Sequence, residues 1–278
     1  MSYKTILLHA DAARSAPLRV QLAAMLAAQQ QAHLVCAAMT GISRYVYRQA
    51  GADSALNVEQ VQQATERARQ ALQQCAQLAN QASLASCEQR LVADDAYGGL
   101  VLQARYADLI VVSQADRDDP ATGALLQDLP EFVALNCPRP VLVVPFAGSF
   151  PTLGEQVVIG WDGSLQAARA VAHALPILRR ARRVTLALFD AVIGDDEHGE
   201  EPGADIALYL ARHGVQVEVL RQPSGGDVGE ALLAAADSLQ ADLVVMGAYG
   251  HTRFREILLG GATRTVLETM TVPVLLAH

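Results

Sequence analysis

The feature that most constrains the fold is a long internal repeat, because the second half of the chain restates apolar segments of the first. The run at 107–112 (ADLIVV) reappears at 241–246 (ADLVVM), and the run at 140–144 (PVLVV) reappears at 273–277 (PVLLA). A repeat of this length predicts two copies of one domain, not a solenoid of short units.

Each copy alternates short apolar runs with helical patterns, which is typical of a parallel sheet covered by helices on both faces. The clearest helix spans Asn57 to Ala82, where apolar residues recur every three or four positions. Strands are expected near 4–10, 33–39, 87–92, 108–113 and 140–145 in the first copy, and near 156–161, 184–190, 215–220, 242–247 and 273–277 in the second. We therefore predict an α/β protein with two tandem, doubly wound, open parallel five-stranded sheets.

The two domains are predicted at 1–146 and 155–278, joined by a linker at 146–154 that contains Gly, Ser and Pro. A length of 278 residues suits two domains of this size. The formal net charge of −8 argues against a nucleic-acid partner, because phosphate backbones attract basic surfaces. No apolar stretch is long enough for a membrane span and no signal peptide is apparent, so we expect no membrane partner and a cytoplasmic protein.

The four cysteines all lie in the first copy: Cys36, Cys75, Cys87 and Cys137. They form no C-x2-C pair and show no zinc-ligand spacing with histidine. The sequence therefore predicts small buried apolar residues in a reducing compartment.

The most informative stretch runs from Asp242 to His278, where glycines flank a strand and a helix. Gly247 and Gly250 follow an apolar strand, and the pair Gly260 and Gly261 precedes a segment with helical spacing. Glycine lets the backbone approach a ligand closely, and a helix start presents unpaired N–H groups at the positive end of its dipole. This arrangement predicts an anion site, with phosphate as the usual guest.

The spacing G-x2-G-x9-G of Gly247, Gly250 and Gly260 resembles the nucleotide-binding signature of the universal stress protein family. The segments MGAYGH, ILLGGATRTVL and VPVLLAH are also similar to that family. The resemblance implies an adenine nucleotide α-hydrolase-like, Rossmann-like fold, with the two copies packed as an internal pseudo-dimer. It also implies that the first and fourth strands of a copy lie side by side.

The resemblance further implies ATP as the ligand of the second copy, with Mg²⁺ left open as its companion. Nucleotide-binding members place Ser or Thr after the last glycine, where the hydroxyl helps to hold phosphate. Gly261 stands at that position here, so the backbone donors remain and the hydroxyl does not. The expected phosphate ligands are Gly247, Gly250, Gly260, Gly261, and the amides of Ala262 and Thr263. The Thr263 hydroxyl either replaces the missing one or faces the core.

Two further residues of the second copy are candidate ligands. Asp162 ends the first strand, where similar family members place an aspartate against the ribose hydroxyls; the alternative is that it caps the next helix together with Ser164. Ser164 is the expected cap. Phe189 ends the second strand, where family members hold adenine through backbone groups, and its side chain is equally compatible with the core.

The first copy lacks the glycine pattern. Ser113, Asp116 and Leu126 stand where Gly247, Gly250 and Gly260 stand in the second copy, and nearby aspartates would repel phosphate. Asp11 matches Asp162 and is expected to cap a helix instead. We expect no nucleotide in this copy.

We find no Ser-His-Asp pattern, no metal cluster and no paired carboxylates, so no catalytic or metal-binding residue is assigned. His9 and Asp11 end a strand together, a pair that is more often structural than catalytic. The sequence favours a tandem universal stress protein that binds ATP in stress response or signalling, with slow hydrolysis at most and with an unidentified protein partner; a homodimer is left open. The alternatives are an interaction module of the same fold that binds no nucleotide, and, less favoured, an adenylyl-transferring enzyme.

Overall fold

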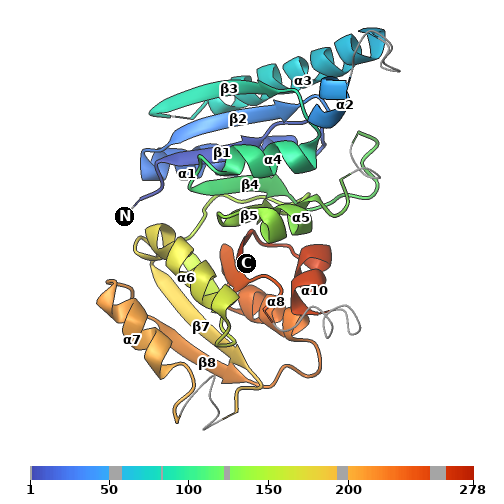
Figure 1. Cartoon of the computed structure of the whole chain (residues 1–278). Helices are drawn as coiled ribbons and strands as arrows, with labels where there is room; N and C mark the ends of the chain where they lie inside the picture. The colour runs from blue at the N-terminus through green and yellow to red at the C-terminus, as the bar shows by residue number, and fades with distance from the viewer. Residues whose placement is uncertain (1, 50–57, 83, 122–125, 193–199, 251–260) are drawn as a thin grey trace. The chain divides into compact units, whose positions relative to one another are not determined.

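The computed structural model describes residues 2–49, 58–82, 84–121, 126–192, 200–250 and 261–278 (Figure 1). The chain divides into a first unit, Ser2–Arg139, and a second unit, Pro140–His278. Both units are built mainly from parallel strands with helices between them, which confirms the predicted α/β class.

The first unit contains a parallel sheet in the order β3-β2-β1-β4. Its strands are β1 (Thr5–His9), β2 (His33–Met39), β3 (Ser86–Val92) and β4 (Leu109–Ser113). Its helices are α1 (Ala16–Gln30), α2 (Arg44–Gln49), α3 (Val58–Ala79), α4 (Ala96–Ala104) and α5 (Leu129–Asn136). Helices α1 and α3 pack together on one face of the sheet, and α4 and α5 pack together on the other (Figure 1).

The second unit contains the order β5-β10-β9-β6-β7-β8. Its strands are β5 (Val141–Val144), β6 (Gln156–Gly160), β7 (Arg183–Phe189), β8 (Glu218–Gln222), β9 (Leu243–Gly247) and β10 (Val274–Ala277). Its helices are α6 (Leu165–Leu178), α7 (Ala204–Arg212), α8 (Val228–Ser238) and α10 (Ala262–Thr269). Strand β5 runs antiparallel to β10, whereas the remaining pairs are parallel. The last strand of the first repeat is therefore hydrogen-bonded to the last strand of the second, which is why the contacts place it in the second unit.

A repeated aspartate explains why the same Ala-Asp sequence precedes the fourth strand of each repeat. Asp108 accepts backbone N–H groups from Lys4 and Thr5 at 2.7 and 3.0 Å, at the start of β1. Asp242 accepts three backbone N–H groups, from 154, 155 and 156, at 3.0–3.1 Å, at the start of β6. Each carboxylate therefore ties the start of the fourth strand to the start of the first and fixes their pairing.

Nine of the ten expected strands lie within two residues of their predicted positions, and the exception is β8. The apolar Val215 and Val217 suggested a strand at 215–220, but the strand begins at Glu218. The N–H of Val215 instead donates to the carbonyl of Leu210 at 2.9 Å, after Gly214 takes a positive φ of 78°. Val215 thus closes the end of α7, where an apolar residue after the left-handed glycine commonly packs back on the helix.

The central strands are buried on both faces, as parallel strands under helices should be. The buried apolar side chains belong mostly to Val, Leu, Ile and Ala, which compensate for an aromatic content of 5%. Strand β3 lies at the end of its strand order and is largely exposed. Cys87 on this strand is therefore exposed, so the prediction that all four cysteines are buried is wrong for this residue. Across the helices of the described ranges, none combines the length and hydrophobicity that a membrane crossing requires.

Candidate functional site

The second repeat places β6 between β9 and β7, so the chain reverses its direction of winding at the β6–β9 pair. This confirms the expectation that the first and fourth strands lie side by side. In open α/β sheets, ligands bind beyond the carboxyl ends of the strands at such a point. Here those ends are Gly160 on β6 and Gly247 on β9.

The loop after β6 contains Asp162, whose carboxylate accepts the backbone N–H of Ser164 at 3.0 Å. Gly163 between them adopts a φ of 76°, which favours glycine and allows the tight turn. The hydroxyl of Ser164 accepts the N–H of Ala167 at 3.1 Å and caps α6, which confirms its predicted role. Because Ser164 supplies the cap, Asp162 is not needed for that purpose.

Gly250 lies directly against this loop. A Cβ added at Gly250 would lie 2.8 Å from Oγ of Ser164 and 3.3 Å from Oδ2 of Asp162. Only a residue without a side chain allows the backbone to come so close to the carboxylate. The structure thus brings two of the predicted ligand residues, Asp162 and Gly250, into contact distance.

Gly247 has a different reason to be glycine. A Cβ at this position would lie 2.5 Å from the backbone nitrogen of Ala167 and 2.7 Å from the carbonyl carbon of Gln166. The end of β9 therefore packs against the first turn of α6, and Gly247 is required for that packing. This position supports the site by holding β9 and α6 together.

The third part of the site is the start of α10. Gly261 is its N-cap residue and offers no side-chain cap, and Ala262 and Thr263 form the first turn. Backbone N–H groups in the first turn of a helix have no partner within the helix and favour anions. The Thr263 side chain is buried, and its hydroxyl accepts the N–H of Tyr249 at 3.1 Å. Thr263 therefore fastens the glycine segment to α10.

We call the set Asp162, Gly247, Gly250, Gly261, Ala262 and Thr263 the glycine site. Gly260, the remaining predicted phosphate ligand, lies outside the described residues. Phe189 ends β7 and is half-buried; β7 lies beside β6, and the N–H of Trp161 donates to the carbonyl of Ala187 at 3.0 Å. Phe189 thus stands at the same edge of the sheet as Asp162, one strand away.

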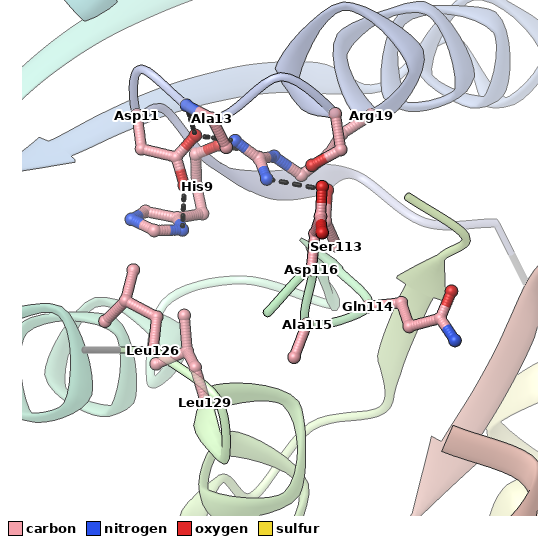
Figure 2. Close-up of a pocket in the computed structure, with 11 residues that line it drawn as sticks. His9, Asp11, Ala13, Arg19, Ser113, Gln114, Ala115, Asp116, Leu126 and Leu129 are labelled. Carbon is pink, nitrogen blue, oxygen red and sulfur yellow. Dashed lines mark hydrogen bonds and ion pairs between the residues drawn. The ribbon is translucent and has the colours of Figure 1, made fainter. Parts of the chain in front are cut away.

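The first repeat has a pocket at the corresponding place, beyond the carboxyl ends of β1 and β4 (Figure 2). We call it the Arg19 pocket. Its volume is about 20 Å³, enough for one water molecule. It is lined by His9, Asp11, Ala13, Ser15, Arg19, Ser113, Gln114, Ala115, Asp116, Leu126 and Leu129.

The side chain of Arg19 is 1% exposed and fills the position between the two strand ends. Its guanidinium donates to Oδ1 of Asp11 at 2.6 Å, to Oγ of Ser113 at 2.7 Å and to the carbonyl of His9 at 2.8 Å (Figure 2). The prediction that Asp11 caps α1 is wrong, because the N-cap residue is Ser15 and the Asp11 carboxylate is bound to Arg19 and to the N–H of Ala13. The carboxylate of Asp11 is therefore bound by a cationic side chain of the same repeat.

Burial and charge shift both ionisable neighbours of Arg19. Burial lowers the pKa of His9 to about 4, an effect that the nearby carboxylate of Asp11 opposes and the charge of Arg19 adds to. For Asp11, burial alone raises the pKa, but Arg19 and His9 outweigh it and the net pKa is lowered. At neutral pH the pocket therefore holds a neutral His9, 3.3 Å from an ionised Asp11 that is paired with Arg19.

The sequence-based reasoning missed Arg19, although a signal was present. On α1, Arg19 shares the helical face of Leu22, Ala23 and Leu26, all of which are buried. A charged residue on the apolar stripe of a helix needs a buried partner. The regular spacing of three and four residues thus pointed to Arg19 as a buried residue of the first repeat.

Within the described ranges, no group of three or more His, Cys, Asp or Glu side chains is arranged to hold a metal ion. Buried charged side chains of those ranges, such as Arg19, Asp94 and Asp119, lie in the first unit. The second repeat therefore offers backbone amides and one carboxylate, whereas the first offers a neutralised ion pair. The second repeat is thus a doubly wound α/β domain with glycines and a helix start at its switch point, the edge at which open sheets of this class bind ligands.

Comparison with known proteins identifies the family of the chain. The family model described as "Universal stress protein family" matches residues 2–145 and 155–278. The chain belongs to the universal stress protein family and carries two of its domains in tandem.

Individual relatives agree with this assignment. A universal stress protein of Mycolicibacterium smegmatis is 32% identical over 124 residues, which is 43% of this chain and 94% of that protein. Universal stress protein Slr1230 of Synechocystis sp. is 26% identical over 148 residues, or 52% of this chain; the match spans about half (49%) of the Synechocystis protein.

Two solved structures share the fold over nearly the full length of this chain. A universal stress protein from Archaeoglobus fulgidus matches 98% of this chain and 95% of its own, with a TM-score of 0.74 and 18% identity. A protein of unknown function from Pseudomonas aeruginosa matches 99% and 92%, with a TM-score of 0.59 and 17% identity. A universal stress protein solved in complex with cAMP matches 53% of this chain and 100% of its own, with 23% identity and a TM-score of 0.38.

Proposed function

We propose that this tandem universal stress protein binds one adenine nucleotide, ATP, at the glycine site of the second repeat, and acts as a nucleotide-dependent stress-response or signalling protein. The observation that carries the proposal is the close approach of Gly250 to Asp162: a Cβ added at Gly250 would lie 3.3 Å from Oδ2 of Asp162. It puts a residue without a side chain beside a carboxylate at the switch point of the sheet. A ribose hydroxyl pair suits the carboxylate, and phosphates suit the amides at the start of α10.

The first repeat is proposed to bind no nucleotide. Arg19 already occupies the carboxylate of Asp11, and the remaining volume of about 20 Å³ is far too small for a nucleoside. Asp116 lines the same pocket and would face any phosphate there with a like charge. The first repeat is then a structural or partner-binding lobe.

Binding, not catalysis, is the proposed activity. A hydrolytic site needs a residue that positions water against the γ-phosphate, together with cations that stabilise the charge that develops. Within the described part of the glycine site, Asp162 is the ionisable side chain, and it already accepts the N–H of Ser164. We propose slow hydrolysis at most, with Mg²⁺ entering, if at all, with the triphosphate.

A second candidate is a protein-interaction module of the same fold that binds no nucleotide. Two observations favour it: Gly261 has no hydroxyl to offer, and the Thr263 hydroxyl is engaged by Tyr249 at 3.1 Å. In this case the amides at the start of α10 would bind water, and nucleotide would have no effect on the protein.

The test compares the variants Asp162→Ala and Ser164→Ala for binding to ATP by calorimetry. Loss of the carboxylate removes charge-assisted hydrogen bonds and should weaken ATP by roughly 10- to 100-fold. Ser164→Ala removes the cap of α6, which should cost about 1 kcal/mol of stability but leave ATP affinity unchanged. Mass spectrometry of the denatured, freshly purified protein adds an independent reading of which nucleotide it retains. The second candidate is favoured if Asp162→Ala binds ATP as tightly as Ser164→Ala does. It is also favoured if the wild-type protein gives no heat of binding at millimolar ATP with Mg²⁺.

A further inference from the structure

The first unit contains three cysteines that meet although they are distant in sequence. Cys36 on β2 and Cys87 on β3 place their Sγ atoms 3.9 Å apart. Cys75 lies on α3, the helix that packs on both strands, and its thiol is near enough to Cys36 to raise the pKa of that thiol. All three are free thiols, and we call them the three-thiol cluster. The fourth cysteine, Cys137, is buried just after α5.

The members of the cluster differ in their access to solvent. Cys36 is 0% exposed and Cys75 is 3% exposed, whereas Cys87 is exposed on the strand at the end of the sheet order. A reagent from solution therefore meets Cys87 first. Cys36 lies immediately behind it, within van der Waals contact of its sulfur.

We propose that the three-thiol cluster is a modification site for hydroperoxides, in which Cys87 is oxidised first and is then bridged to Cys36. In the first step the Cys87 sulfur takes one oxygen from hydrogen peroxide, forming a sulfenic acid and releasing water. In the second step the Cys36 sulfur attacks the sulfenic sulfur, the S–O bond breaks, and the departing hydroxide leaves as water with the Cys36 proton. Two thiols are oxidised to one disulfide, and one peroxide is reduced to two waters.

The register of the strands predicts that this bridge is strained and easily reduced. Leu34 pairs with Cys87 and Cys36 pairs with Gln89, so the two cysteines are diagonal neighbours on adjacent strands. Strands about 4.8 Å apart with a rise of about 3.3 Å per residue place Cα atoms that are two residues out of register about 8 Å apart. An unstrained disulfide joins Cα atoms about 5.5–6 Å apart. Bridging must therefore shift β3 along β2. Strand β3 lies at one end of the strand order, where β2 is its pairing partner. Strained, exposed disulfides are the labile ones, which suits a reversible switch.

The test treats the reduced full-length protein with hydrogen peroxide, blocks remaining thiols and maps linked peptides by mass spectrometry without reduction. Trypsin places Cys36 in peptide 20–44 but leaves Cys75 and Cys87 together in peptide 70–90, so variants must assign the partner. Burial raises the pKa of the Cys87 thiol, and a mildly alkaline buffer therefore helps the first step. Cys75→Ser is the matched control because it removes one thiol of the cluster but leaves both partners of the proposed bridge, Cys36 and Cys87.

The proposal predicts a link between peptides 20–44 and 70–90 in the wild type and in Cys75→Ser, its absence from Cys36→Ser and Cys87→Ser, and full reversal by dithiothreitol. Circular dichroism of each reduced variant checks that it is folded. A link that survives in Cys87→Ser and disappears in Cys75→Ser assigns the bridge to the buried pair and overturns the proposal. Oxidation of Cys87 to sulfinic acid with no link, or equal oxidation of Cys137, overturns it as well. The result does not depend on whether the glycine site binds nucleotide.

Discussion

Arg19 donates to Asp11 at 2.6 Å across the switch point of the first repeat, whereas the matching Asp162 of the second repeat faces the bare backbone of Gly250. The two repeats share their strand order and their anchoring aspartates but differ in what meets this carboxylate. In the first repeat the chain itself supplies a cation to this carboxylate, whereas in the second repeat a residue without a side chain lies against it.

The first prediction concerns the stability of the Arg19 pocket. Arg19→Met removes the cation from a buried pair and leaves Asp11 without compensation, which should cost about 3–5 kcal/mol in the free energy of unfolding. Arg14→Met, at an exposed arginine just before α1, should change stability by less than about 0.5 kcal/mol. Urea unfolding of both variants measures the difference. Equal midpoints would show that the Arg19 pair contributes nothing.

The second prediction concerns acid stability. The pKa of His9 is about 4 in the folded protein, below the ordinary histidine value of 6.5, so between these values the unfolded chain binds more protons. Stability should therefore fall as pH is lowered from 6.5 towards 4, by about 2 kcal/mol between pH 7 and pH 5. The lowered pKa of Asp11 adds a further loss in more acidic solution, as its carboxylate protonates. His9→Gln should lack the loss between pH 7 and pH 5; if urea midpoints of the variant and the wild type fall in parallel, His9 is not its source.

The third prediction separates packing from ligand binding at the strand ends. Gly247→Ala forces a Cβ to 2.5 Å from the backbone of α6 and should destabilise the protein by about 1–3 kcal/mol. Gly160→Ala is the matched control on β6, where the new Cβ comes closest to the end of the Leu232 side chain, at 3.0 Å, which can move. Thermal unfolding should show a clear loss for the first variant and a small one for the second. The reverse order would contradict the packing role of Gly247.

The fourth prediction restores the missing hydroxyl. Gly261 is the N-cap residue of α10, a position that favours serine, and its φ of −39° is negative, as L-residues prefer. Gly261→Ser should strengthen ATP binding roughly tenfold by adding a hydrogen bond to a charged phosphate. Gly261→Ala makes the same backbone change without the hydroxyl and should not. The single tryptophan, Trp161, is next to Asp162, so its fluorescence provides the titration signal. Identical binding curves for the serine and alanine variants would contradict a phosphate at this position.

Much of the fold could be predicted from sequence because parallel strands under helices are continuous apolar runs. The two Ala-Asp-Leu segments also marked where a carboxylate ties two strands together, as Asp108 and Asp242 do. The error at β8 came from Val215, which is apolar because it closes a helix and not because it lies in a strand. An apolar run alone does not distinguish these two uses.

The candidate site could be predicted only in part. Glycine spacing located the loop, but sequence did not show that Gly247 serves packing while Gly250 borders the carboxylate. The sequence favours a helix cap for Asp11, because its partner, Arg19, is eight residues away on a helix face whose other residues are apolar. Contacts between a loop and a helix interior depend on the packing angle, and spacing does not encode that angle.

The central claim is that one repeat binds nucleotide and the other does not, and the stoichiometry of binding tests it most directly. Isothermal titration calorimetry of the full-length protein with ATP, ADP, AMP and cAMP gives the number of sites and ranks the ligands. We predict one ATP per chain, with weaker binding as phosphates are removed. Two nucleotides per chain would contradict the filled Arg19 pocket, and none would contradict the glycine site.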